Sequence, residues 1–363
     1  MRVQVRAGNS SYEAIVGAEL IAAAGSLIAD KSDAVRCAVI ADSNIADRFA
    51  PVLEQSLKKS GLQSTFIKVP AGEESKNLEQ VGRICEQMLA AGLDRQSLLI
   101  GLGGGVIGDI SGFVAAIFQR GIPHVQIPTT LLAMVDSSIG GKTGVNTSAG
   151  KNLLGAIHHP LMVIDDIDLL RTLPPREFRQ GYAEIIKHGI IADAEMFEEL
   201  KAIQPLLLQP REFDAETLAP LIRRNIRIKS QGVARDEMDR TGDRAVLNFG
   251  HTIGHGIERA GDYHTFMHGE AISLGMVAAA GISVKRAGLP TTGRDAIIAL
   301  LRSFGLPTEL PGNFPRRQIL SALKFDKKFQ SGEIRFVVTP RIGSAYLATD
   351  VTMEDIEEAV AEI

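Results

Sequence analysis

Cysteine and tryptophan are scarce in this chain, which has two cysteines and no tryptophan among its 363 residues. Cys37 and Cys85 stand in apolar surroundings, which favours two buried thiols in a reducing compartment over a disulfide framework or a cysteine-ligated metal site. Apolar runs of the roughly 18 residues that a membrane span requires are also lacking. The N-terminus alternates like a strand and has no secretory signal pattern. We therefore expect a cytoplasmic protein without a membrane partner.

An excess of positive charge is lacking as well. The chain carries 39 lysines and arginines against 43 aspartates and glutamates, a net charge of -4. This balance argues against a general nucleic-acid-binding protein, although it is compatible with a local basic pocket. The length exceeds the size at which a single hydrophobic core keeps growing, so we expect two domains.

The first half of the chain alternates short apolar strands with helices, a rhythm typical of α/β domains. Strands are expected at 34–41, 64–69, 97–102, 125–128 and 162–165, helices at 45–59, 78–91 and 106–118, and a hairpin or loop at 140–155. After Pro174-Pro175 the periodicity is helical, apart from a strand-like segment at 334–338. We predict an α/β fold with a Rossmann-like N-terminal domain at 1–170 and a mainly α-helical C-terminal domain at 171–363.

A glycine-rich turn formed by Gly103, Gly105 and Gly108 lies between an apolar strand and a helix. Missing side chains there would let the backbone approach a pyrophosphate at the helix N-terminus. The acidic residue expected about 20 positions later in a Rossmann unit is absent, since the next strand ends in Pro128-Thr129-Thr130. The alternative is a tight turn without a ligand. Carboxylates that follow other strands could bind the ribose instead: Asp42, Glu73 or Glu74.

The segment Gly141-Lys142-Thr143 has the ending of a nucleotide P-loop. In a P-loop four residues separate the first glycine from the Gly-Lys pair, which puts that glycine at position 136, and this position is aspartate. Lys142, Lys151 and Asn152 are better suited to supply ammonium groups and an amide to a smaller anion. The alternative is a solvated loop with two surface lysines.

Histidine is concentrated late in the chain, where four of the eight histidines fall between positions 251 and 268. His251 and His255 would share one face of a helix, and His268 could return to that face after a turn. Glu184, on another expected helix with Lys187, could complete a Glu/His/His set with open positions, as catalytic zinc sites have. Taken singly, a histidine is more often structural, and a Glu/Lys pair three residues apart is usually a surface pair.

Basic residues accompany this histidine group in a chain of net negative charge. Arg244 precedes Asn248 by four residues, and Lys229 lies one expected helix upstream. With Lys142, Lys151 and Lys187 they could form a cationic pocket near a metal. Such a pocket favours a small substrate that carries phosphate or carboxylate. Each base taken alone could equally be a surface charge.

Five segments together resemble the 3-dehydroquinate synthase family, and the likeness runs nearly end to end. They are Gly104–Asp109, Gln126–Ser138, Gly140–Gly144, Gly181–Lys187 and Leu247–His255. The resemblance implies a homodimeric shikimate-pathway enzyme that uses NAD and a divalent metal, zinc or cobalt. Its reaction would convert 3-deoxy-D-arabino-heptulosonate 7-phosphate into 3-dehydroquinate and phosphate by transient oxidation, phosphate elimination, re-reduction and intramolecular aldol closure.

The same resemblance assigns roles to individual residues. The metal ligands fall on Glu184, His251 and His268, and the N-terminal domain would bind NAD. The substrate carboxylate falls to Arg244 and Lys229, and substrate hydroxyl groups fall to Asp136 and Lys187. The resemblance assigns His255 to the substrate phosphate and not to the metal. The other residues assigned to the phosphate are Lys142, Asn152, Asn248, Lys328 and, from a second subunit, Arg120. The implied NAD contacts are Asp42, Asn44, Glu73, Lys76, Gly105, Val106, Ile107, Gly108, Asp109, Thr129, Thr130, Lys142 and Lys151.

Three other functions compete with this one. Another sugar-phosphate cyclase would share NAD, metal and elimination but lack a substrate carboxylate, so Arg244 and Lys229 favour dehydroquinate. An oxidoreductase similar to glycerol dehydrogenase would produce NADH from a simple alcohol, and the cationic pocket would have no purpose there. A non-enzymatic nucleotide-binding module would explain the glycine-rich turn alone.

Overall fold

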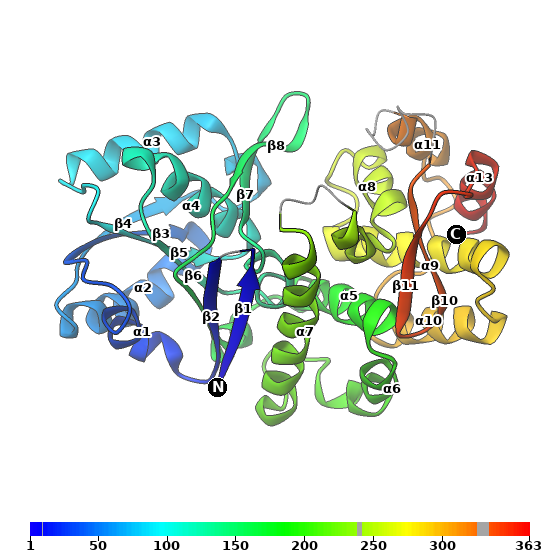
Figure 1. Ribbon diagram of the computed structural model, residues 1–363, viewed down its shortest axis with the longest axis horizontal. Helices are drawn as coiled ribbons and strands as arrows, with labels where there is room; N and C mark the ends of the chain where they lie inside the picture. The colour runs from blue at the N-terminus through cyan, green and yellow to red at the C-terminus, as the bar shows by residue number, and fades with distance from the viewer. Residues whose placement is uncertain (9, 238–241, 325–333) are drawn as a thin grey trace. The chain divides into compact units, whose positions relative to one another are not determined.

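The computed structural model describes residues 1–8, 10–237, 242–324 and 334–363 (Figure 1). It forms two compact units, one of Met1–Leu173 with Asp214–Ala234 and the other of Pro174–Phe213 with Arg235–Ile363. Along the chain, the first boundary between the two units follows Leu173, close to the boundary expected near 170. The division differs from the predicted one in Asp214–Ala234, which belongs to the first unit although we expected it in the C-terminal domain.

The first unit is built on a seven-stranded sheet with the order β1-β2-β9-β6-β5-β3-β4. β1 and β2 form an antiparallel hairpin, and every other neighbouring pair is parallel. The strands are β1 (Arg2–Ala7), β2 (Ser10–Gly17), β3 (Arg36–Asp42), β4 (Gln63–Val69), β5 (Leu98–Gly103), β6 (His124–Pro128) and β9 (Met162–Asp166). A separate hairpin pairs β7 (Lys142–Thr147) with β8 (Gly150–Ile157).

Helices cover both faces of this sheet. α1 (Leu20–Ala29) and α2 (Ser43–Lys59) pack on one face, and α3 (Leu78–Ala90) and α4 (Gly105–Ile117) on the other. A hydrophobic core cluster lies between the sheet and the helices on each face, and aliphatic side chains of the strands contribute to both clusters. The strands β5, β6 and β9 are therefore buried at every position. α7 (Ala215–Arg235) joins this unit, where the Arg6 amide donates to Ser230 Oγ at 3.2 Å. Short helical turns connect these elements: η1 (Glu73–Ser75), η2 (Phe118–Arg120), η3 (Ala133–Ser137) and η4 (Ile167–Thr172).

The second unit is mainly helical and surrounds α9 (His268–Ala287), which is buried on nearly all sides. α9 contacts α5 (Pro175–Ala192), α8 (His251–Ala260), α10 (Thr291–Ser303), α13 (Met353–Glu362) and β10 (Phe336–Arg341). Its alanine- and glycine-rich sequence suits this central place, because small side chains let neighbouring helices approach. The remaining elements are α6 (Ala194–Ile203), η5 (Gln204–Leu206), η6 (Asp243–Asn248), α11 (Arg316–Lys324) and β11 (Ser344–Ala348).

Most elements predicted from the sequence are confirmed. β3 to β6, β9 and α2 to α4 lie within two residues of their expected bounds, and 140–155 lies mostly in the β7–β8 hairpin. The predicted strand at 334–338 corresponds to β10, but its antiparallel partner β11 was not predicted. β2 and α1 were also not predicted. Among the described residues, no helix is both long enough and apolar enough to cross a bilayer.

One ion-pair group fixes α13 against α9. The Arg286 guanidinium donates from Nε to Asp355 Oδ2 at 2.7 Å and from Nη2 to Oδ1 at 2.9 Å, and Lys285 Nζ lies 2.8 Å from Oδ1. Asp355 Oδ2 also accepts a hydrogen bond from the Thr352 amide, and the Thr352 hydroxyl accepts one from the Asp355 amide, so the two residues form the capping box of α13. Burial alone would raise the pKa of Asp355, but Arg286, Lys285 and Thr352 together hold it well below its ordinary value.

We predict that Asp355→Asn lowers the free energy of unfolding at pH 7 by roughly 1–3 kcal/mol, because it removes the buried negative charge that pairs with Arg286 and Lys285. Since the pKa is lowered in the folded state, this contribution is present at neutral pH and shrinks as the pH falls below about 4. Urea unfolding measures both. The exposed Glu357→Gln, which removes the same charge from α13, should change stability little, and equal effects of the two variants would contradict the prediction.

Candidate functional site

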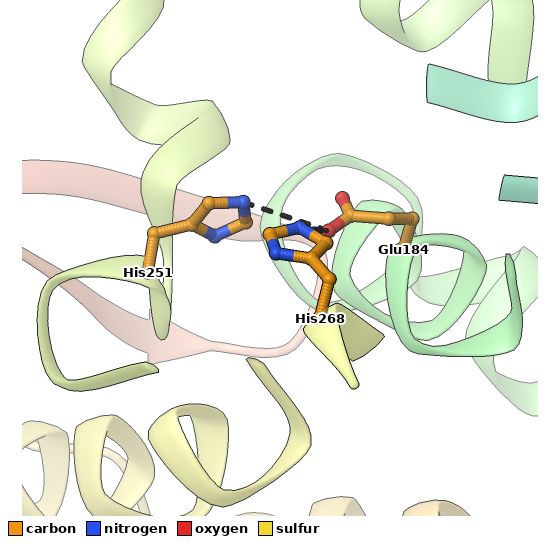
Figure 2. A group of neighbouring side chains, drawn as sticks. All are labelled: Glu184, His251 and His268. Atoms are coloured by element: carbon orange, nitrogen blue, oxygen red, sulfur yellow. Dashed lines mark ion pairs between the residues drawn. The ribbon is translucent and has the colours of Figure 1, made fainter. Parts of the chain in front are cut away.

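Glu184, His251 and His268 come together in the second unit although they lie on three different helices (Figure 2). Glu184 Oε1 is 3.5 Å from His251 Nε2 and 3.7 Å from His268 Nε2. One ligand atom from each residue lies within 4.8 Å of the others. Both imidazole rings face the carboxylate (Figure 2), so the three atoms can share one ion.

Local backbone geometry places the two histidines. Gly250 has a φ of 78° and precedes α8, so His251 is the first residue of that helix. A Cβ at Gly250 would lie 2.6 Å from Met276 Cγ and 2.7 Å from the Met276 amide nitrogen, so only glycine fits this turn without strain. His268 is likewise the first residue of α9. Glu184 extends from the middle of the buried helix α5.

The charge of Glu184 is compensated inside the protein. Lys187 Nζ, one turn later on α5, forms an ion pair with Glu184 Oε2, and both side chains are almost fully buried. Burial raises the pKa of Glu184, but the Lys187 ammonium, with smaller contributions from His251 and His268, outweighs it and holds the pKa well below its ordinary value. Glu184 Oε1 is buried and accepts no hydrogen bond from the described residues. An ionised, unsatisfied oxygen facing two imidazoles fits a bound divalent cation.

The two histidines differ in charge state. Burial and the nearby Lys187 ammonium lower the pKa of His251 well below its ordinary value. Burial also disfavours the charged form of His268, but Glu184 and Glu258 flank that ring and raise its pKa to about 10. Without a metal ion, His268 is therefore protonated, and its positive charge offsets the negative charges of Glu184 and Glu258. Ligation requires the neutral ring.

The other two histidines between positions 251 and 268, His255 and His264, lie in different surroundings. The ring centroid of His255 lies 5.4 Å from that of His251 and 6.1 Å from that of His268, and its side chain is exposed. His264 lies in the turn between α8 and α9. Glu258, which our reading of the sequence missed, lies 3.5 Å from His268 Nδ1. Glu258 follows His251 by seven residues and His255 by three, so on a helix it lies on the same face as the two histidines. This spacing could have identified it from the sequence.

Arg244 and Asn248 lie on η6, immediately before the Gly250 turn. This 3-10 helix is separate from α8, which begins at His251. Arg244 is buried, and its Nη1 donates to the Glu237 carbonyl at 3.4 Å. Lys187 is placed beside Glu184 as described above. Lys328 lies outside the described residues.

In the first unit, the predicted NAD contacts other than Lys142 and Lys151, which lie on the β7–β8 hairpin, end or follow strands at the carboxyl edge of the parallel sheet. Asp42 ends β3, Glu73 and Lys76 follow β4, Gly105 follows β5, and Thr129 follows β6. The chain runs from β3 to β4 on one side and then returns to β5 on the other side of β3. Ligands of such sheets bind at this change of direction. The turns after β3 and β5 border it.

The glycine-rich turn adopts the predicted strand-to-helix geometry. Gly104 precedes α4 without a side-chain cap, and the first backbone bond runs from the Gly108 amide to the Gly104 carbonyl at 3.0 Å. Amides before Gly108 thus precede the helix ladder and suit an anion. Cβ atoms at Gly104 and Gly105 would lie 3.0 Å from Thr130 Cγ2 and 3.1 Å from Ser137 Oγ. The missing side chains therefore also allow close packing.

Polar contacts organise this edge. Lys76 is buried and forms an ion pair with Asp109, the fifth residue of α4. Burial raises the pKa of Asp109 although Lys76 opposes the shift. Glu73 Oε1 accepts from Asn146 Nδ2 at 2.8 Å, and Asp42 Oδ1 accepts from the Asn44 amide at 2.7 Å. Val106, Ile107 and Thr130 lie on the same edge.

Several predicted substrate residues also lie in the first unit. Lys229 Nζ is 2.7 Å from Asp136 Oδ1, and Asp136 belongs to the π-helical turn η3. Lys142 begins β7, whereas Lys151 and Asn152 lie on β8 of the same hairpin. Arg120 is exposed on a turn in which Gln119, Arg120 and Gly121 have φ values of 52°, 71° and 118°. Left-handed conformations at two non-glycine residues are strained and often mark functional turns.

Several solved structures are similar to this chain over essentially its whole length. A 2-deoxy-scyllo-inosose synthase complexed with carbaglucose-6-phosphate, NAD+ and Co2+ is 26% identical with a TM-score of 0.89, and 100% of this chain and 99% of that chain are covered. A 2-epi-5-epi-valiolone synthase from Streptomyces hygroscopicus with NAD+ and Zn2+ is 29% identical with a TM-score of 0.88 at the same coverage. A probable glycerol dehydrogenase from Sinorhizobium meliloti, 17% identical with a TM-score of 0.67 over 96% of this chain and 95% of that one, shares the fold.

Sequence similarity identifies the family. Residues 66–180 match the model of the 3-dehydroquinate synthase N-terminal region, and residues 181–329 match that of the C-terminal region. The 3-dehydroquinate synthase of Cereibacter sphaeroides is 41% identical over 99% of this chain and 98% of its own length. That of Acidithiobacillus ferrooxidans is 44% identical over 95% and 93%. This chain therefore belongs to the 3-dehydroquinate synthase family.

Proposed function

We propose that this chain converts 3-deoxy-D-arabino-heptulosonate 7-phosphate into 3-dehydroquinate and phosphate in the shikimate pathway, as an NAD- and metal-dependent carbon–oxygen lyase. The observation that carries the proposal is the buried, unsatisfied Glu184 Oε1 facing His251 and His268, in a chain that belongs to the 3-dehydroquinate synthase family.

Glu184, His251 and His268 would hold zinc or cobalt. The ion, when bound, acidifies a coordinated substrate hydroxyl. Three protein ligands leave positions for substrate oxygens, as in catalytic zinc sites. Lys187 keeps Glu184 ionised, so the carboxylate is ready to bind a cation. The related cyclases with Co2+ and Zn2+ support this assignment.

The carboxyl edge of the sheet would hold NAD, which when bound accepts a hydride from the substrate and returns it in the same turnover. Amides of the first turn of α4 would receive the pyrophosphate. The residues proposed to contact NAD are Asp42, Asn44, Glu73, Lys76, Gly105 to Asp109, Thr129, Thr130, Lys142 and Lys151. Lys76 neutralises Asp109 and thereby lowers the repulsion between this turn and a diphosphate.

The remaining residues would orient the substrate. Arg244 and Lys229 would bind its carboxylate, and Asp136 and Lys187 its hydroxyl groups. Before substrate binds, Asp136 compensates the Lys229 charge and the Glu237 carbonyl accepts from Arg244. Groups that donate to the phosphate would stabilise the negative charge that develops as it leaves. These groups are Lys142, Asn152, Asn248, His255 and Lys328.

We also propose a homodimer in the cytoplasm. The strained, exposed turn around Arg120 would extend that guanidinium toward the substrate phosphate of a second copy. The two free thiols, Cys37 and Cys85, suit a reducing compartment.

Metal dependence provides the first test. Purified protein mixed with the heptulosonate phosphate should release phosphate only when NAD and a divalent ion are both present. Dialysis against a chelator should abolish release, and zinc or cobalt should restore it, while a mock-dialysed sample stays active. Phosphate release that persists in the chelator would contradict the metal assignment.

Arg244→Ala tests the substrate. We predict that kcat/KM falls roughly 100-fold or more, because a buried charged contact to the carboxylate is lost, while bound metal measured by elemental analysis stays unchanged. Arg244→Lys should recover only part of the activity, since lysine lacks the planar bidentate geometry of arginine. The exposed Arg317→Ala serves as a matched control. Unchanged kinetics of Arg244→Ala would favour a cyclase whose substrate has no carboxylate.

A further inference from the structure

The two proposed histidine ligands have the same arrangement of ring nitrogens. In each, Nε2 faces Glu184 Oε1 while Nδ1 faces a different oxygen. For His251 this oxygen is the Phe249 carbonyl, 3.2 Å from Nδ1. For His268 it is Glu258 Oε1, 3.5 Å from Nδ1. A metal-bound histidine usually donates its second N–H to such an oxygen, which fixes the tautomer and the ring orientation.

Glu258 is rigidly placed for this contact. It lies on α8, seven residues after His251, and its side chain is 7% exposed. α8 and α9 touch through their backbones, because a Cβ at Gly275 would lie 2.0 Å from the Gly250 carbonyl oxygen and one at Gly254 would lie 3.0 Å from the Ala271 carbonyl oxygen. Glu258 on α8 and His268 at the start of α9 are therefore held at a fixed separation.

We propose that Glu258 is a positioning residue that accepts the Nδ1 hydrogen of His268 and so keeps Nε2 directed at the metal. The inference rests on the metal site of the proposed function and assigns Glu258 no contact with substrate. The buried carboxylate also increases the electron density of the imidazole, which strengthens its bond to a divalent ion. His251 needs no such carboxylate, because the Phe249 carbonyl is supplied by its own turn.

Metal affinity of the full-length protein tests this role without relying on activity. Cobalt and zinc are titrated against a competing chelator into wild type, Glu258→Gln and Glu258→Ala, and the visible absorption of bound cobalt is recorded. We expect Glu258→Ala to weaken binding about 10- to 100-fold and to change the cobalt spectrum. Glu258→Gln should weaken it several-fold, because an amide oxygen is a poorer acceptor than a carboxylate. The exposed Glu357→Ala should leave affinity and spectrum unchanged.

Affinity and spectrum of Glu258→Ala equal to those of wild type would overturn the inference. If that variant does not fold, Glu258→Gln decides in the same way. A second bound metal equivalent that only the Glu258 variants lose would also overturn it, since His255, Glu258 and His268 would then form a site of their own. Failure of wild type to bind any metal would instead refute the proposed function.

Discussion

The second unit depends on one buried negative charge. An isolated carboxylate in a protein interior would take up a proton, but Lys187 on the same helix and two histidines from other helices keep Glu184 ionised. This arrangement explains why α5, α8 and α9 must be packed closely. It also explains the glycines at the α8–α9 contact, because any side chain at Gly275 would separate the helices that carry the histidines.

The first unit rests on a different constraint, the parallel order of its strands. A parallel sheet aligns all its carboxyl ends at one edge. Residues that are far apart in sequence, such as Asp42, Lys76, Asp109 and Thr129, are thereby gathered without any local sequence signal linking them. The contacts between them are then electrostatic, as in the pairing of the buried Lys76 with Asp109.

The sequence predicted those features that depend on hydrophobic periodicity and on the spacing of residues along the chain. Fully apolar strands and amphipathic helices gave most of the α/β unit, and the density of histidines marked the segment that supplies His251 and His268 to the Glu184 cluster. Helical spacing correctly placed His251 beside His255, whereas the contact between His251 and Glu184 joins two helices and depends on how α5 packs in the second unit. The inclusion of Asp214–Ala234 in the first unit follows from tertiary packing, which periodicity does not encode. Glu258 was missed because an acidic residue on a helix resembles any solvated one until its burial is known.

His251 and His268 are each the first residue of a helix. The start of a helix carries a partial positive charge from its aligned peptide dipoles, so two such starts converge on the cluster. This field repels a bare cation and attracts oxygen anions. In the neutral form that ligation requires, the two imidazoles would therefore hold a divalent ion weakly on their own, and the full negative charge of Glu184 is what makes the position attractive to metal. The same field would favour a substrate that arrives with its own negative oxygen.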